Sequence, residues 1–122
     1  MPPSRWHPDD FLPLTHLGFH VLLALVDQPL HGYAIVRAVR VQSHDKVDPG
    51  TGSFYSIVRG LCDQSLIEPV ASPYADAVDR RRFYALTPLG RRVLAAESAR
   101  LEGLIREVRR RGVRRPAKAG GR

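Results

Sequence analysis

The chain has 122 residues, of which 43% are hydrophobic and 25% charged, and this is the composition of a single soluble globular domain. No apolar run approaches the ~18 residues that span a bilayer, and a single cysteine, Cys62, excludes an internal disulfide, so we expect a cytoplasmic protein without membrane contact. The formal charge of +7 is uneven, because residues 1–79 hold 5 basic and 9 acidic residues whereas residues 80–122 hold 14 and 3. Total charge is therefore weak evidence for nucleic-acid binding, and the placement of individual arginines matters more.

The first helix follows a proline-rich arm. Residues 1–13 predict an irregular segment, in which we interpret Trp6 and Phe11 as a hydrophobic clamp rather than as the lining of an effector cavity. From Thr15 the apolar residues follow helical spacing, and the helix should end before Pro29, which disfavours helical geometry at the preceding residue. Its apolar surface is wide, which indicates burial in a core or at a subunit contact.

Two more helices precede a change of pattern. The sequence predicts a second helix over 32–43 and a third helix that is capped by Gly50 or Thr51. The apolar residues of the third helix recur at i, i+4 and i+7 and are Phe54, Val58 and Leu61. One face of this helix should therefore be buried, while the opposite face points outward.

A hairpin and a long helix complete the chain. The segments LIEPVA (66–71) and RRRFYALT (80–87) have strand composition and are separated by a turn. Thr87 followed by Pro88 is a specific helix start. Three helices followed by a hairpin describe a mainly α (α+β) fold, the winged helix-turn-helix. The expected parts are an N-terminal arm (1–13), a winged helix-turn-helix DNA-binding domain (14–87), a C-terminal dimerisation helix (88–111) and a disordered basic tail (112–122).

The third helix has the residues of a DNA-recognition helix. Such a helix enters the major groove with its N-terminal residues, and glycines there let the backbone approach phosphates closely. The stretch GTGSFYS (50–56) meets this requirement, and its hydroxyl groups can donate to phosphate oxygens or base edges. The predicted contacts on this helix are Thr51, Ser53, Tyr55, Ser56 and Arg59. The alternative is a solvated helix with incidental serines and glycines.

The hairpin adds weight to the DNA-binding interpretation. Arg80, Arg81 and Arg82 follow the turn, and arginines at the tip of a wing can enter the minor groove, where the negative potential is strongest. A solvated run of charge is the alternative. Coupled to the third helix, Arg80 and Arg81 complete the predicted DNA-binding set.

Three stretches in the same order resemble the PadR-type transcriptional regulators. They are LLALVDQPLHGYAIVRAV, GTGSFYSIVRGLCDQSLIE and RRRFYALTPLGRRVL, and the resemblance covers roughly residues 14–105. In the family's pattern Ser53 stands for threonine, Phe54 for leucine and Ser65 for the glycine that usually ends the recognition helix. Ser65 should therefore adopt a left-handed backbone, or the helix should leave by a different turn. Gly60 stands where a basic residue is common in the family.

The resemblance implies a homodimer in which the last helix and the first helix pack across a two-fold axis. The sequence supports this independently, because a helix of ~24 residues spans about 36 Å, and its apolar residues fall near coiled-coil spacing. The residues expected at the interface are Leu22, Leu94, Leu101, Leu104, Ile105 and Val108.

Other candidate sites have simpler interpretations. His16 and His20 stand four residues apart, but no third metal ligand accompanies them at a recognisable spacing, so we favour a surface or interface role and expect no metal. We interpret His31 as a structural hydrogen-bonding residue at a helix start. Cys62 fits a small core residue better than an oxidation sensor. No catalytic arrangement or phosphate loop is present, so we expect neither an enzyme nor a cofactor.

Together these observations predict a sequence-specific DNA-binding transcriptional regulator. We expect a dimeric repressor that binds double-stranded DNA at an inverted-repeat operator and is released by a small-molecule effector. Two alternatives remain open. A winged helix can be a protein-interaction module whose arginines bind an acidic partner, and the basic tail can make the protein an architectural nucleic-acid binder without sequence preference.

Overall fold

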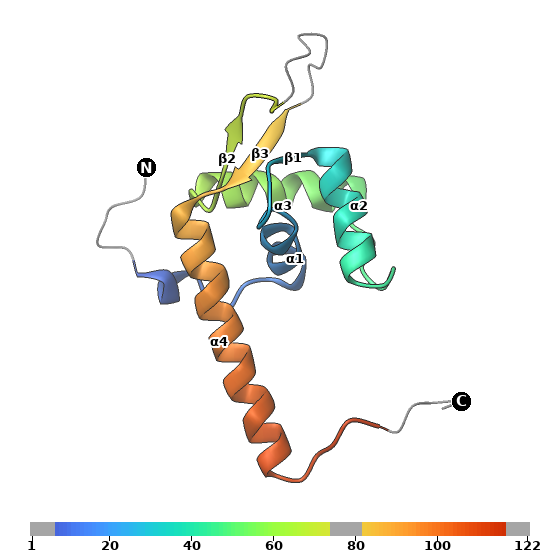
Figure 1. Cartoon of the computed structure of the whole chain (residues 1–122), viewed down its shortest axis with the longest axis vertical. Coiled ribbons are helices and arrows are strands. Elements are labelled where there is room, and N and C mark those ends of the chain that lie inside the picture. Colours follow the sequence, from blue (N-terminus) through green and yellow to red (C-terminus); the bar gives the residue numbers. More distant parts are fainter. Residues whose placement is uncertain (1–6, 74–81, 117–122) are drawn as a thin grey trace.

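Four α-helices and a small sheet make up the part of the chain that the computed structural model describes, residues 7–73 and 82–116 (Figure 1). The helices are a short 3-10 helix η1 (Pro8–Phe11), α1 (His16–Ala24), α2 (Gly32–Gln42), α3 (Thr51–Asp63) and α4 (Pro88–Arg110). The first three α-helices cluster with the sheet, and α4 extends away from them (Figure 1). None of the helices in these two segments is long and apolar enough to cross a membrane.

The sheet has three antiparallel strands, where the sequence predicted a two-stranded hairpin. They are β1 (Leu30–His31), β2 (Ile67–Val70) and β3 (Phe83–Leu86), in the order β1-β3-β2. In the hairpin Ile67 lies opposite Leu86, and on the other side of β3 Leu30 lies opposite Tyr84. The additional strand, β1, is only two residues long, so it leaves no alternation in the sequence that could predict it.

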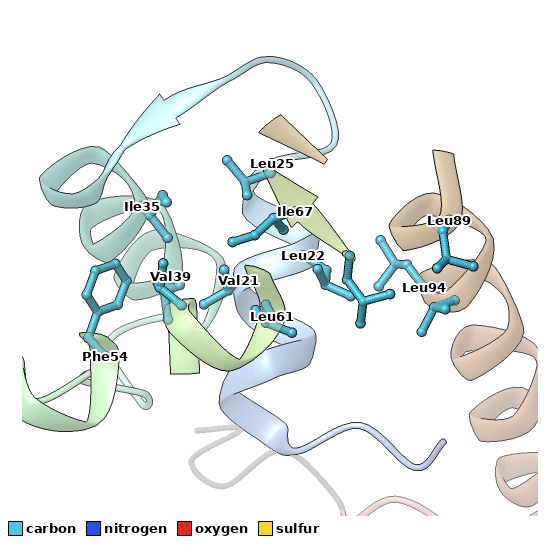
Figure 2. Packing of buried hydrophobic residues seen from close by; sticks show 13 residues of the cluster. Val21, Leu22, Leu25, Ile35, Val39, Phe54, Leu61, Ile67, Leu89 and Leu94 are labelled. Carbon is cyan, nitrogen blue, oxygen red and sulfur yellow. The ribbon is translucent and has the colours of Figure 1, made fainter. Parts of the chain in front are cut away.

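The core is formed where α1 lies between the other helices. Figure 2 shows α1 at the centre, with side chains of α2 and α3 on one side and of α4 on the other. The fully buried members include Val21, Leu22, Ile35, Val39, Leu66 and Val93. The predicted stripe of α3, Phe54, Val58 and Leu61, belongs to the same core.

Helix α1 ends earlier than the sequence suggested. Its N-cap is Thr15, whose Oγ1 accepts a hydrogen bond from the Gly18 amide at 2.9 Å. At the other end the amides of Leu25 and Val26 donate to carbonyls three residues back, at 3.1 and 3.2 Å, so the last turn tightens and the helix stops well before the proline. The general position of the helix was correct, and its end was set by this turn.

The exit of α3 has a left-handed residue, which is one of the two geometries that the family resemblance left open. Ser65 has φ 62°, although it is not glycine. The Leu66 amide donates to the Leu61 carbonyl at 2.9 Å, and the Ser65 amide donates to the Cys62 carbonyl at 2.9 Å. These two bonds are the Schellman motif, which satisfies the last carbonyls of the helix and turns the chain into β2.

The predicted cap of α4 also joins this helix to the end of α3. Thr87 Oγ1 accepts from the Gly90 amide at 2.9 Å and donates to the Ser65 carbonyl at 2.7 Å. The Thr87 amide donates to the Leu66 carbonyl at 3.1 Å. Gly90 packs so closely here that a Cβ atom would lie 2.0 Å from the Leu66 carbonyl oxygen. The start of α4 is therefore held against the chain that leaves α3.

Candidate nucleic-acid interface

Helix α3 divides into a buried and an exposed face, as predicted. Phe54, Val58 and Leu61 are buried, whereas Tyr55 is 59% exposed. The exposed polar residues of the helix include Ser53, Ser56 and Arg59. Thr51 is the first residue of α3, and its side chain lies outside what the structure describes. The predicted contact residues with a described side chain therefore lie on the surface of one helix, away from its core stripe.

The beginning of α3 is open and uncapped. Gly50 is the N-cap and provides no side-chain hydrogen bond, and the first turn contains no acidic residue. Around Gly50 and Gly52 no atom lies within 4 Å of where a Cβ would stand. The partial positive charge of the helix N-terminus is therefore exposed at the end that the serines and Tyr55 surround.

An irregular turn between α2 and α3 sets where this end lies. His44 and Asp45 both have positive φ, at 54° and 62°, and the Ser43 hydroxyl accepts from the Val47 amide at 3.0 Å. Arg40 of α2 donates through Nε and Nη2 to Asp48 Oδ1, at 3.1 and 2.9 Å. This ion pair, which the sequence analysis missed, joins α2 to the segment just before α3.

The described residues include only part of the predicted wing. Arg80 and Arg81 lie outside the described residues. Arg82, just before β3, is exposed. Strand β3 lies between β1 and β2, so the strands that lead to the wing are connected directly to the start of α2.

His31 has the structural role expected of it. It is the N-cap of α2, and its Nδ1 accepts from the Ala34 amide at 3.2 Å. Its ring meets the Phe83 ring edge-on, with centroids 5.3 Å apart. His31 therefore connects α2 to strand β3 of the wing.

His16 and His20 form a ring contact and not a metal site in the segments described. Their ring centroids are 4.8 Å apart, and no group of three metal-ligating side chains occurs in these segments. Gln42 Nε2 donates to the His20 carbonyl at 2.8 Å and lies 2.9 Å from His20 Nδ1. Burial, with a smaller contribution from His16, lowers the pKa of His20. The pair thus belongs to the contact between α1 and α2.

Cys62 is half-buried on α3, at the edge of the core, as a small packing residue would be. Burial raises the pKa of its thiol, with a further contribution from Asp63. A raised pKa reduces the fraction of reactive thiolate at neutral pH, which argues against an oxidation sensor.

The residues expected at a subunit interface fall into two groups. Leu22 and Leu94 are buried inside the single chain, at 0% and 8% exposure, and have little surface to offer a partner. Leu101 is half-buried, and Leu104, Ile105 and Val108 are each close to half exposed. These four line one groove on the distal part of α4, together with Val113 and the arginines 109, 114 and 115.

Glu97 is a structural residue that the sequence analysis missed. It lies on the buried face of α4 at 2% exposure. Its Oε2 accepts from the Leu14 amide at 2.9 Å and from Arg100 Nη2 at 3.0 Å. These contacts, chiefly the hydrogen bond from Arg100, lower the pKa of Glu97. An acidic residue on an apolar face, three residues before an arginine, was the available signal.

A family model described as the transcriptional regulator PadR-like family matches residues 21–96, which is more than half of the chain. The chain belongs to the PadR-like family. This family consists of transcriptional regulators.

Solved PadR structures have the same fold. A PadR family transcription regulator from Clostridium difficile R20291 is 18% identical with a TM-score of 0.67, over 79% of this chain and 97% of that one. A PadR family transcriptional regulator from Eggerthella lenta is 26% identical with a TM-score of 0.63, over 77% and 79%. The winged helix-turn-helix predicted from the sequence is thereby confirmed.

A relative of greater sequence identity is much longer. An uncharacterized 37.1 kDa protein in transposon TN4556 of Streptomyces fradiae is 39% identical over 90 residues, which is 71% of this chain and 24% of that protein. The chain therefore spans about a quarter of the length of this relative.

Proposed function

We propose that this PadR-family regulator binds a specific double-stranded DNA operator through α3 and the wing. The observation that carries the proposal is the exposed face of α3, which has an uncapped start without acidic residues and presents Ser53, Tyr55, Ser56 and Arg59 over its first two turns. This surface is complementary to a polyanion in charge and to the major groove in shape. Arg59 forms no ion pair with any residue in the described segments, so its guanidinium is available to DNA.

The roles of the residues follow from their chemistry. Tyr55 and Arg59 are one helical turn apart on the same face, and both can reach base edges. The hydroxyls of Thr51, Ser53 and Ser56 are suited to phosphate oxygens near the helix start. We assign Arg80 and Arg81 to the backbone or the minor groove at the wing, as the sequence predicts.

The proposed regulator is a homodimer on an inverted repeat. What supports this is the row formed by Leu101, Leu104, Ile105 and Val108, which is partly exposed on a helix that extends beyond the rest of the domain (Figure 1). Apolar side chains at helical spacing on a projecting helix are stabilised by a second helix. The division that we propose gives residues 14–87 to DNA binding and 88–111 to dimerisation, with 112–122 as a basic tail.

Repression and release by a small molecule complete the proposal. Both are supported by the resemblance of the chain to PadR-type regulators, and a cytoplasmic location agrees with its single unpaired cysteine, Cys62. A reporter gene placed behind the operator should be silenced when the protein is expressed. Reporter activity that rises on expression would identify an activator instead.

Binding to specific and random duplexes tests the main proposal. The parent protein first selects its operator from a pool of random-sequence duplexes. Arg59→Ala should then cost about 1–3 kcal/mol on the selected duplex and less on a random duplex, because a base contact is lost only on the operator. Arg81→Ala should weaken both and flatten the dependence on salt.

The alternatives give different results in the same experiment. A protein-interaction module would bind neither duplex, and an architectural binder would bind both equally. Both variants should keep the melting temperature of the parent, since Arg59 lies off the core stripe of α3 and Arg81 belongs to the predicted wing. Variants that fold normally and bind the operator as tightly as the parent would refute the DNA-reading assignment.

A further inference from the structure

A second exposed polar surface lies on α2, next to the recognition helix. Tyr33, the second residue of α2, is 65% exposed, and Arg37 is exposed one turn later on the same face. The Arg37 guanidinium carbon lies 5.8 Å from the centroid of the Tyr33 ring. The buried residues of this helix, Ile35 and Val39, project elsewhere, into the core (Figure 2). Tyr33 and Arg37 therefore contribute little to the core of the chain.

The polar groups of Arg37 and Tyr33 are not paired with other protein groups in the described segments. Arg37 has no carboxylate partner there, and the Tyr33 hydroxyl has no hydrogen-bond partner there. Arg40, one turn further along α2, differs in this respect, because it is paired with Asp48. One arginine of α2 is thus used within the chain, and the other is available to a ligand.

Ring contacts hold Tyr33 in place. The Tyr33 ring is nearly parallel to that of His31, with an interplanar angle of 5° and centroids 6.4 Å apart. His31 in turn contacts the buried Phe83 of β3. A row of rings therefore extends from the sheet to the surface and ends in Arg37. Side chains that are already ordered lose less entropy when they bind a ligand.

The start of α2 also lies against the start of α3. A Cβ atom on Gly32 would lie 3.5 Å from the Phe54 ring. Phe54 is followed by the exposed Tyr55, and their ring centroids are 5.4 Å apart. Each residue of the Gly32–Phe54 contact is followed in the chain by an exposed tyrosine, Tyr33 on α2 and Tyr55 on α3.

We propose that the Tyr33 hydroxyl and the Arg37 guanidinium bind a phosphate of the DNA strand that flanks the groove entered by α3. The inference rests on the proposed function. In a helix-turn-helix the first helix of the pair crosses the DNA backbone while the second enters the groove. Tyrosine and arginine are both donors to phosphate, and contacts of this kind position the protein without reading the sequence.

Three variants in the full chain test this assignment on the selected operator and on a random duplex of equal length. Tyr33→Phe removes only the hydroxyl and keeps the ring stack, and Arg37→Gln removes the charge. Each should weaken binding to both duplexes by a similar factor, about 3- to 10-fold, and Arg37→Gln should reduce the salt slope by about 0.9. Arg106→Gln is the matched control, and its affinity should change by less than about twofold because Arg106 is exposed on α4, the helix that extends away from α2 and α3 (Figure 1).

The outcomes separate this inference from the proposed function. If Arg59→Ala weakens operator binding while Tyr33→Phe and Arg37→Gln bind like the parent, the phosphate contact is refuted and the proposed function stands. A loss confined to the operator would also refute it, because a phosphate contact is insensitive to sequence. A parent protein that selects no duplex would overturn both. Equal melting temperatures of parent and variants establish that affinity, and not folding, has changed.

Discussion

Because Gly90 packs directly against Leu66, a single methyl group added at position 90 should strongly destabilise the fold. In Gly90→Ala the new Cβ would stand 2.0 Å from the Leu66 carbonyl oxygen and 2.9 Å from Leu86 Cδ1. Real Cβ atoms essentially never approach another heavy atom within 3.0 Å, so the two segments must separate by about 1 Å. The atom in the way is backbone, which no side-chain rotation can move.

The cost can be worked out from what the separation breaks. The Leu66 carbonyl accepts from the Thr87 amide at 3.1 Å, and the loss of this bond costs about 1 kcal/mol. The forced methyl group itself costs about 1–3 kcal/mol. Alanine has a higher helix propensity than glycine, which offsets this cost by about 1 kcal/mol. We therefore expect Gly90→Ala to lower the free energy of unfolding by about 1–3 kcal/mol.

Gly60 of α3 provides a matched control. No atom lies within 4 Å of the position that its Cβ would take. The same substitution, Gly60→Ala, should therefore raise the free energy of unfolding by up to about 1 kcal/mol through helix propensity alone. The two variants are chemically identical changes in helices, and only their packing gives them opposite signs.

Urea denaturation of parent and both variants measures this difference. All three must be compared at one protein concentration, since subunit association makes the midpoint depend on concentration. A Gly90→Ala variant as stable as the parent would refute the argument that the start of α4 is held against Leu66. A destabilised Gly60→Ala variant would show that the space around α3 is not open.

Three further predictions concern other parts of the chain. The pKa of Glu97 is lowered chiefly by the hydrogen bond from Arg100, so the ionised carboxylate stabilises the fold at neutral pH and this stabilisation is lost as pH falls below about 4.3. Glu97→Gln should therefore make the free energy of unfolding depend less on pH in the acid range. An unchanged dependence would contradict this. Replacing Leu101 and Ile105 together by Asp should give monomers, because two unpaired charges would be buried at the proposed interface; a double variant that still sediments as a dimer would place the interface elsewhere. Deleting residues 112–122 should lower affinity for operator and random DNA by similar factors, whereas a loss confined to the operator would assign sequence reading to the tail.

The sequence by itself determined the features that depend on a few neighbouring residues. Thr87 and Pro88 begin α4 because a capping hydroxyl and a preset φ act within one turn. The buried stripe of α3 could be predicted because its apolar residues recur at helical spacing. For Ser65 the sequence left open a left-handed residue or a different turn, and the structure has the left-handed one. The family motifs lie in these same local segments, which is why the fold class could be predicted.

Only the tertiary structure decided which distant segments meet. Strand β1 exists because His31 pairs with Phe83, more than fifty residues away, and two residues have no period of their own. Glu97 is buried because the Leu14 amide reaches it from the N-terminal segment. Leu22 lies in the core of the chain and not on its surface. An apolar side chain suits a core and a subunit interface equally well, so only the packing of the other helices decides between the two.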